Sequence, residues 1–260
     1  MIRRRTPRPI RAVTFDCWGT LLLDSPAADE GYRRQRLSGI EAALAEGGVP
    51  VAARDLDRAY AVVVERLGRI WQRGRDIPVS GHVDALLDAV DPGLPTRLSP
   101  GTREAVLEAY AAPALSVPPA VDTGARATLE TLGQQGLRLA VVSNIMRTPG
   151  TALRIVLDRA GVLRPFSVLT FSDECGIRKP DPEMFLLTLR QLGVAPAEAV
   201  HVGDDPVLDV EGAQDAGMRV VHVVPVGQGV GPSRPDAVIA GLGELPAALL
   251  DLGRGAAAPR

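Results

Sequence analysis

The sequence has few aromatic residues and almost no lysine. Four Phe, three Tyr and two Trp account for 3% of its 260 residues, so its core must be built from Leu, Val and Ala. Such a composition gives no stacking platform for single-stranded nucleic acid. The formal net charge of −2 creates no global field that would recruit polyanions. We therefore expect no nucleic-acid partner. Lys179 is the single lysine among 29 basic residues, which makes its position informative.

Metal-spaced cysteines and long apolar runs are also missing. Cys17 and Cys175 lie far apart and match no metal-binding spacing, which predicts buried thiols in a reducing compartment. The longest apolar stretches, 137–142 and 220–226, are far shorter than a membrane span. The arginines near the start are not followed by the apolar segment typical of a signal peptide. We therefore expect a cytoplasmic protein with no membrane partner.

Short apolar runs alternate with helical patterns in the second half of the chain. The predicted strands are residues 12–15, 137–142, 167–171, 199–202, 219–224 and 237–239. The helices predicted between the later strands are 149–160, 182–192 and 207–216. Apolar strands that alternate with helices indicate an α/β fold, with a parallel sheet covered on both faces. The length suits one large α/β domain with an insertion.

The segment between the first two strands has a different, helical character. Apolar residues from Leu56 to Trp71 recur on one helical face, and 41–46, 82–90 and 103–111 are predicted as further helices. A helical block at this point of an α/β sheet is a cap domain, close to the sheet edge where ligands bind. We predict a core of 1–24 and 117–252, a cap of 25–116, hinges at 23–26 and 116–119, and a disordered tail of 253–260.

Polar side chains follow four of the predicted strands. They are Asp16 after the first, Ser143 and Asn144 after the second, Lys179 between two prolines after the third, and Asp204, Asp205 and Asp209 after the fourth. The carboxyl ends of parallel strands meet at one edge of a sheet. We therefore expect a nucleophile, hydrogen-bond donors, a cation and a carboxylate cluster to converge into one site.

Four motifs occur in a familiar order. They are FDCWGTL (15–21), VVSN (141–144), GIRKPDPEMF (176–185) and VGDDPVLDVEGAQDAGM (202–218). With this set the chain resembles the haloacid dehalogenase superfamily of hydrolases over nearly its whole length. The resemblance implies a Rossmann-like core and, from the insertion point, a helical cap of the first type.

The resemblance also implies a role for each matching residue. Asp16 would be the nucleophile and form a covalent aspartyl intermediate that water then hydrolyses. Lys179 would neutralise charge on the nucleophile and the transition state. Mg²⁺ would be bound by Asp16, Asp204 and the backbone carbonyl of Trp18. The supporting residues would be Thr20 and Ser143 as hydrogen-bond partners of the transferring group or of Asp16, Asn144 as a further contact, and Asp205 and Asp209 as residues that hold metal waters or orient Lys179.

Lysine at position 179 is informative because the chain otherwise uses arginine. An ammonium is a compact point charge that fits beside an aspartate and a phosphate, whereas a guanidinium is a wider planar fork. The retained Lys179 therefore favours a functional requirement for a point charge.

Trp18 departs from the usual phosphatase pattern. Most phosphatases of the superfamily carry a second aspartate at this position as general acid and base, and such help is typically worth about 10²–10⁴-fold. The 2-haloacid dehalogenases also lack it, but they work without Mg²⁺ and replace the acidic fourth motif by Ser and Asn. Asp204, Asp205 and Asp209 give this chain the phosphatase form of that motif, which outweighs Trp18.

We therefore predict a Mg²⁺-dependent hydrolase, most simply a phosphatase of a small phosphorylated metabolite. The alternatives are a 2-haloacid dehalogenase-type hydrolase and a protein of this fold with weak or no catalysis because of Trp18. The phosphonate-cleaving branch forms a Schiff base with a cap lysine, and residues 25–116 contain no lysine. That branch is excluded.

The substrate and the oligomeric state stay open. Cap residues that could read a second anionic group are Arg66, Arg69 and Arg73 on one helical face, and Tyr32, Arg33 and Arg36 after the first hinge. Charges on a solvated face are the favoured interpretation of these arginines. Trp18 could pack against a substrate or fill the hinge. The three histidines, His82, His201 and His222, lack a metal-like grouping and are interpreted as structural.

Overall fold

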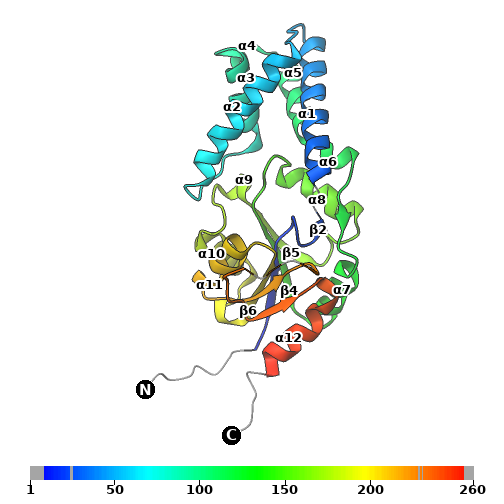
Figure 1. Ribbon diagram of the computed structural model, residues 1–260, viewed down its shortest axis with the longest axis vertical. Helices are drawn as coiled ribbons and strands as arrows, with labels where there is room; N and C mark the ends of the chain where they lie inside the picture. The colour runs from blue at the N-terminus through cyan, green and yellow to red at the C-terminus, as the bar shows by residue number, and fades with distance from the viewer. Residues whose placement is uncertain (1–8, 24–25, 228, 230, 255–260) are drawn as a thin grey trace.

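A six-stranded parallel sheet forms the base of the molecule (Figure 1). The computed structural model describes residues 9–23, 26–227, 229 and 231–254. The strand order is β5-β4-β1-β6-β7-β8. The strands are β1 (Ala12–Phe15), β4 (Arg138–Ser143), β5 (Phe166–Phe171), β6 (Ala199–Gly203), β7 (Arg219–Val223) and β8 (Ala237–Ile239). Each corresponds to a predicted strand, so the α/β fold with a Rossmann-like parallel sheet is confirmed.

The side chains of the central strands alternate between two apolar layers, as the period of a β-strand requires. On β1, Val13 and Phe15 join one cluster and Ala12 joins the other. On β4, Val141 and Ala140 divide in the same way. The first layer is covered by α7 (Ala125–Gln134), α8 (Gly150–Arg159) and α12 (Leu245–Arg254), and the second by α10 (Pro182–Leu192) and α11 (Gly212–Asp215). Figure 1 shows α10 and α11 on the opposite side of the sheet from α7 and α12.

Some helices differ from the prediction. The predicted helix 207–216 is a π-helical turn, η2 (Pro206–Glu211), followed by α11. Helices α7 and α12 were not predicted, because each is only three turns long and begins close to a proline or glycine turn. α12 ends at Arg254, so residues 253 and 254 are helical and the predicted tail is wrong there. The remainder of that tail, 255–260, lies outside the described residues.

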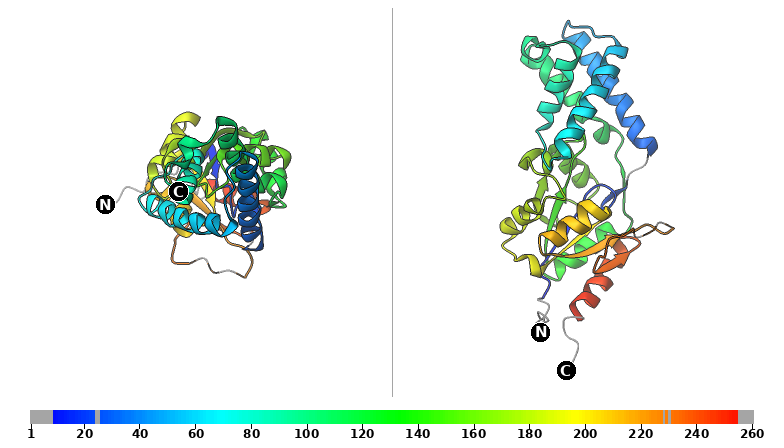
Figure 2. Two further views of the ribbon diagram at one scale, coloured as in Figure 1. Left: turned by 90° about the horizontal axis from the view of Figure 1, so that it is seen from above. Right: turned by 60° about the vertical axis from the view of Figure 1, so that its left-hand side comes forward.

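Six helices between the first two sheet strands stand above the carboxyl edge of the sheet (Figures 1 and 2). They are α1 (Pro26–Glu46), α2 (Ala53–Trp71), α3 (Val79–Val90), α4 (Leu94–Arg97), α5 (Pro100–Ala111) and α6 (Pro113–Ser116). α1 packs against α5, and α2 against α3. The sequence predicts only 41–46 of α1, because Gly31 and Gly39 interrupt the pattern of its first part. We call this helical block the cap.

The two chain segments that join the cap to the sheet lie side by side. β2 (Leu22–Leu23) pairs with β3 (Ala120–Val121) in a short antiparallel ribbon. The remaining short elements are α9 (Ser172–Cys175), η1 (Pro196–Glu198) and η3 (Leu242–Glu244). Within the described residues, no helix is long and apolar enough to cross a membrane. Of the two cysteines predicted as buried, Cys17 is buried and Cys175 is half-buried.

A second contact joins the cap to the core at the loop between α2 and α3. The carboxylate of Asp76 accepts hydrogen bonds from Ser172 Oγ and Arg178 Nη1, both at 2.6 Å. The backbone pairs as well, because Arg178 N donates to Gly74 O and Asp76 N donates to Gly176 O. The Arg178 guanidinium also lies over the Trp71 ring, 4.4 Å from its centroid. We call Asp76, Ser172 and Arg178 the latch. It fixes the cap to the loop that carries Lys179.

Candidate active site

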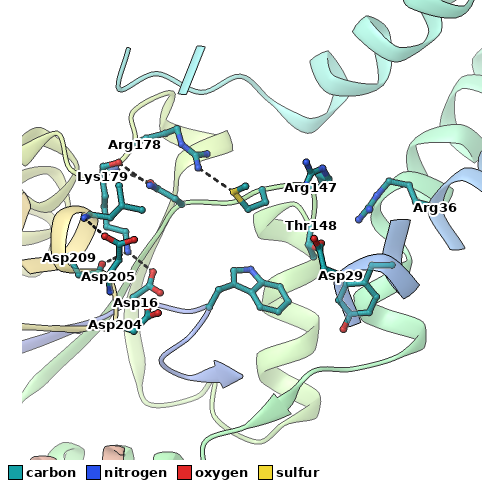
Figure 3. Close-up of a pocket in the computed structure, with 15 residues that line it drawn as sticks. Asp16, Asp29, Arg36, Arg147, Thr148, Arg178, Lys179, Asp204, Asp205 and Asp209 are labelled. Carbon is teal, nitrogen blue, oxygen red and sulfur yellow. Dashed lines mark hydrogen bonds and ion pairs between the residues drawn. The ribbon is translucent and has the colours of Figure 1, made fainter. Parts of the chain in front are cut away.

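A cavity of about 490 Å³ is lined by residues of the sheet edge and of cap helix α1 (Figure 3). Most of the predicted site residues line it: Asp16, Trp18, Asn144, Lys179, Asp204, Asp205 and Asp209. Thr20 and Ser143 are buried beside it and do not line it. The cavity also receives Asp29, Tyr32, Arg36, Met146, Arg147, Thr148, Arg178 and Leu208. The strand-end residues therefore converge as the topology of a parallel sheet requires.

Lys179 joins two carboxylates at the base of the cavity. Its ammonium donates to Asp16 and to Asp209 Oδ1, the latter at 2.6 Å. All three side chains are buried. Burial alone would lower the pKa of Lys179, but the two carboxylates raise it, so the ammonium stays charged. Burial raises the pKa of Asp16, and the Lys179 charge opposes that rise.

Asp204 lies beside Asp16, because Asp204 follows β6, Asp16 follows β1, and these two strands are neighbours in the sheet. Burial, followed by the Asp209 charge, raises the pKa of Asp204 to about 6. Thr20 Oγ1 donates to Asp204 Oδ1 at 3.4 Å. Gly19 permits this approach. Its φ is +78°, and a Cβ there would lie 2.3 Å from Asp204 Oδ2.

Asp209 is held from several sides by protein groups. Its Oδ1 contacts Lys179 and also His201 Nε2 at 3.0 Å, and its Oδ2 accepts from Asp205 N at 3.0 Å. His201 Nδ1 in turn contacts Thr14 Oγ1 at 2.8 Å. Burial lowers the pKa of His201, which favours the neutral ring. The resulting chain of contacts holds the Asp209 carboxylate against Lys179.

Two histidines interpreted as structural thus lie directly behind the site. His201 contacts Asp209, and His222 Nε2 contacts the backbone carbonyl of Asp204 at 2.8 Å. The available signal was their position, since both are polar residues inside apolar parallel strands, where burial requires a partner. His82 lies in the cap near Tyr110 and Asp76, away from this cluster.

Asn144, Ser143 and Asp205 take distinct places. The Asn144 side chain donates to Lys179 O and accepts from Lys179 N, both at 2.9 Å, so it fixes the lysine backbone. Ser143 Oγ is buried, with no hydrogen-bond partner among the described residues. Asp205 Oδ1 accepts from Val207 N and Leu208 N at 2.8 Å. Asp205 therefore caps the turn that carries Asp209.

The acidic cluster carries more negative charge than the Lys179 ammonium alone can balance, which suits it to a divalent cation. Oxygens of Asp16, Asp204 and Asp209 lie within 4.8 Å of one another. Three carboxylates face one lysine there, and both Asp16 and Asp204 have raised pKa values. Because Asp209 is already hydrogen-bonded through both oxygens, Asp16 and Asp204 are the carboxylates with capacity for a metal. Few carboxylates and several waters are what Mg²⁺ prefers.

The cap arginines divide into two kinds. Arg66, Arg69 and Arg73 are exposed, and Arg69 pairs with Glu65, in agreement with a solvated face. Arg36 contradicts that interpretation, because it is buried and lines the cavity. The signal was present, since Arg36 lies on the i, i+4 stripe of α1 formed by Tyr32, Arg36, Ile40 and Leu44. Arg147, after β4, also lines the cavity and was not predicted.

Known proteins with similar sequences are hydrolases. The chain is 32% identical over 219 residues to a glyceraldehyde 3-phosphate phosphatase of Methanopyrus kandleri, covering 82% of this chain and 84% of that protein. It is 42% identical over 113 residues to a phosphoserine phosphatase of Thermus thermophilus, covering 44% of this chain and 43% of the relative.

Solved structures agree with the sequence comparison. A 2-haloacid dehalogenase of Pseudomonas syringae has a TM-score of 0.69 at 27% identity, with 94% of this chain and 99% of that one covered. A HAD phosphatase of Thermococcus onnurineus has a TM-score of 0.60 at 27% identity, with 92% and 98% covered. Residues 10–217 match the family described as haloacid dehalogenase-like hydrolase, and this match covers the first three motifs and all but the last residue of the fourth. The chain belongs to the haloacid dehalogenase-like hydrolase family.

Proposed function

We propose that the protein is a Mg²⁺-dependent phosphatase that hydrolyses a small phosphorylated metabolite through a covalent bond to Asp16. The observation that carries this proposal is the convergence of buried Asp16 and Lys179 with half-buried Asp204 at one edge of the sheet. A haloacid substrate needs no acidic residue at position 204, whereas a phosphate ester with a metal does. The similarity to a glyceraldehyde 3-phosphate phosphatase over most of both chains supports the same reading.

The reaction divides into two displacements at phosphorus. A carboxylate oxygen of Asp16 forms a bond to phosphorus while the ester P–O bond breaks, and the leaving oxygen gains a proton. Water then attacks phosphorus, and the bond between phosphorus and Asp16 breaks to release inorganic phosphate. Lys179 stabilises the negative charge that the phosphoryl oxygens and Asp16 carry in both steps. Ser143 Oγ, which has no partner among the described residues, supplies a donor next to Asp16 in this scheme.

The metal would be held by Asp16, Asp204 and the backbone carbonyl of Trp18. Mg²⁺ supplies positive charge that neutralises phosphoryl oxygens during transfer. Thr20 and Asp209 keep the two carboxylates in place, Thr20 by its bond to Asp204 and Asp209 through Lys179.

A dehalogenase is the second candidate, because Trp18 stands where a general acid is usual. Release of chloride from a carbon atom needs no protonation, and a solved 2-haloacid dehalogenase superposes well on this chain. Against it stand the carboxylates of Asp204 and Asp209, which repel a carboxylate substrate unless a cation is bound.

Phosphate and chloride release measured side by side test the proposal. The panel contains sugar phosphates, acyl phosphates, nucleotides and 2-chloropropionate, each with Mg²⁺ and with excess chelator. We expect phosphate release that chelator abolishes and that the Asp16→Asn variant lacks. Chloride release in chelator would instead establish the dehalogenase. Turnover retained by Asp16→Asn would refute the nucleophile, and no turnover on any substrate would favour a binding protein.

A further inference from the structure

Two arginines lie at the end of the cavity away from the acidic cluster. Figure 3 shows Arg36 and Arg147 together with Asp29 and Thr148 on one side, and Asp16 with its acidic neighbours on the other. Arg36 comes from α1 of the cap, whereas Arg147 comes from the loop after β4. The two guanidinium groups therefore line the same cavity, one from the cap and one from the core.

Arg36 is an almost fully buried charge that has no acidic partner among the described residues. Its exposed fraction is 2%, and its Nε donates to Tyr110 O at 2.8 Å. Its guanidinium lies over the Tyr110 ring, 5.0 Å from the centroid. Buried charges are rarely left unpaired, because removing them from water is costly. The terminal nitrogens of Arg36 lack a carboxylate that would compensate for this burial.

Arg147 is half-buried on the core side and also lies against a tyrosine. Its guanidinium lies over the Tyr60 ring, 5.6 Å from the centroid. Its Nε is buried, with no hydrogen-bond partner within the described part of the chain. Asp29 lines the same end, but it is exposed and makes no ion pair with either arginine among the described residues. Two positive charges are thus held on buried tyrosine rings and directed at a cavity.

We infer that Arg36 and Arg147 form a subsite for a second anionic group, a carboxylate or a phosphate, on the substrate. This inference rests on the proposed function, because Asp16 must receive the first phosphate at the other end. Guanidinium groups bind carboxylate and phosphate oxygens through two parallel hydrogen bonds. An anion there supplies the compensation that both arginines lack. The substrate class is a phosphate monoester with a second negative group, and neutral phosphorylated alcohols are poor substrates.

Matched pairs of phosphate esters test the subsite. 3-Phosphoglycerate and glycerol 3-phosphate differ in a carboxylate, and fructose 1,6-bisphosphate and fructose 6-phosphate differ in a second phosphate. We expect kcat/KM to favour one doubly anionic partner by at least ~10-fold, as charged hydrogen bonds allow. In Arg147→Gln this ratio falls to below about 3 because the charge is lost. The pair that discriminates identifies the anion, carboxylate or phosphate.

An exposed arginine provides the control. Arg69→Gln removes a cap charge that pairs with Glu65 on the surface, so its substrate ratio stays that of the wild type. Arg36→Gln is a second probe, used only if its thermal unfolding matches the wild type, because Arg36 is buried. An unchanged ratio in Arg147→Gln, or equal kcat/KM within both pairs in the wild type, overturns the inference.

Binding separates this inference from the proposed function. Calorimetry on Asp16→Asn with the same four compounds needs no turnover. If the subsite exists, a doubly anionic compound binds about 10-fold more tightly than its matched partner, and Arg147→Gln on that background abolishes the difference. Equal affinities would refute the subsite even in an active phosphatase. A difference in affinity without any phosphate release would refute only the proposed function.

Discussion

At the scale of single residues, Lys179 illustrates how geometry selects one side chain. Its ammonium lies between Asp16 and Asp209. The residue is 3% exposed, and Asn144 fixes its backbone. We expect Lys179→Arg to lose about 100-fold in kcat, because the wider fork cannot keep the same charge placement beside the transferring group. Steady-state kinetics with Mg²⁺ and thermal unfolding of the same samples measure this. Activity close to wild type would show that any cation suffices.

Trp18 raises a second question at this scale, the source of the proton for the leaving group. A carboxyl group at position 18 would supply it, so Trp18→Asp should accelerate alkyl phosphate hydrolysis by about 10-fold or more relative to p-nitrophenyl phosphate, whose leaving group needs no proton. Trp18→Asn is the matched control, because asparagine has the size of aspartate and lacks its carboxyl group. An unchanged ratio of alkyl to nitrophenyl rates in Trp18→Asp would mean that protonation is not limiting.

The residues that could be predicted are those carried by strand ends. Asp16 and Asp204 follow apolar strands directly, and Lys179 lies in the loop that follows β5 and α9. The topology of the sheet therefore brings them to one edge. Arg147 and Asp76 could not be found in this way. Each acquires its place only when cap and core meet, and that meeting is decided by contacts between residues about a hundred positions apart in the chain.

At the scale of elements, the turn after β1 depends on a glycine. Gly19 has φ +78°, and a Cβ there would meet the Asp204 carboxylate at 2.3 Å. Gly19→Ala should therefore displace Asp204 and lower activity by about 100-fold or more, as loss of a group that stabilises the transition state does. The left-handed backbone adds about 1 kcal/mol of destabilisation. Phosphate release at increasing Mg²⁺ concentration measures the first effect, and urea unfolding the second.

Gly48 offers a matched control for that variant. It has the same φ of +78°, with nothing within 4 Å of an added Cβ. Gly48→Ala should lose a similar stability, about 1 kcal/mol, and retain its activity. Equal activities of the two alanine variants would contradict the role of Gly19 in admitting Asp204.

The elements themselves were predictable to different degrees. The sheet strands are continuous apolar runs, and their burial on both faces makes that pattern reliable. Helix α1 was predicted only at its end, because its buried stripe includes Arg36 and the part before residue 41 contains two glycines. An apolar-periodicity argument counts an arginine as solvent-exposed, so it missed the longer first part of the helix and the charge that this part brings into the cavity.

At the scale of the whole molecule, the cap is tied to the core at two places. The β2–β3 ribbon pairs the two chain segments that run between the core and the cap. At the second place, the latch of Asp76, Ser172 and Arg178 joins the cap to the core through buried groups. Within the latch, Arg178 lies in the same loop as Lys179. The position of the cap and the position of the Lys179 ammonium are therefore coupled through neighbouring residues, Arg178 and Lys179.

The latch also makes stability depend on pH. Burial acts to raise the pKa of Asp76, but the His82 ring, Ser172 and the Arg178 charge hold it below its usual 3.8. A carboxyl group whose pKa is lowered by folding stabilises the native state above its unfolded pKa, and that stability is lost as the pH falls through the folded value. The contribution of Asp76 is therefore complete at pH 7 and declines at pH values below about 4.

Asp76→Asn tests this contribution, because it removes the charge and leaves Arg178 buried without its partner. We expect a loss of about 3 kcal/mol in the free energy of unfolding at pH 7, the order found when one member of a buried ion pair is removed. The difference from wild type should shrink as the pH falls below about 4, where wild-type Asp76 itself becomes protonated. Asp84→Asn removes an exposed carboxylate paired with Arg103, so it should cost less than about 1 kcal/mol. Urea unfolding of all three proteins between pH 3 and 7 decides the matter. A difference for Asp76→Asn that stays constant over this range would mean that the latch acts by packing and not by charge.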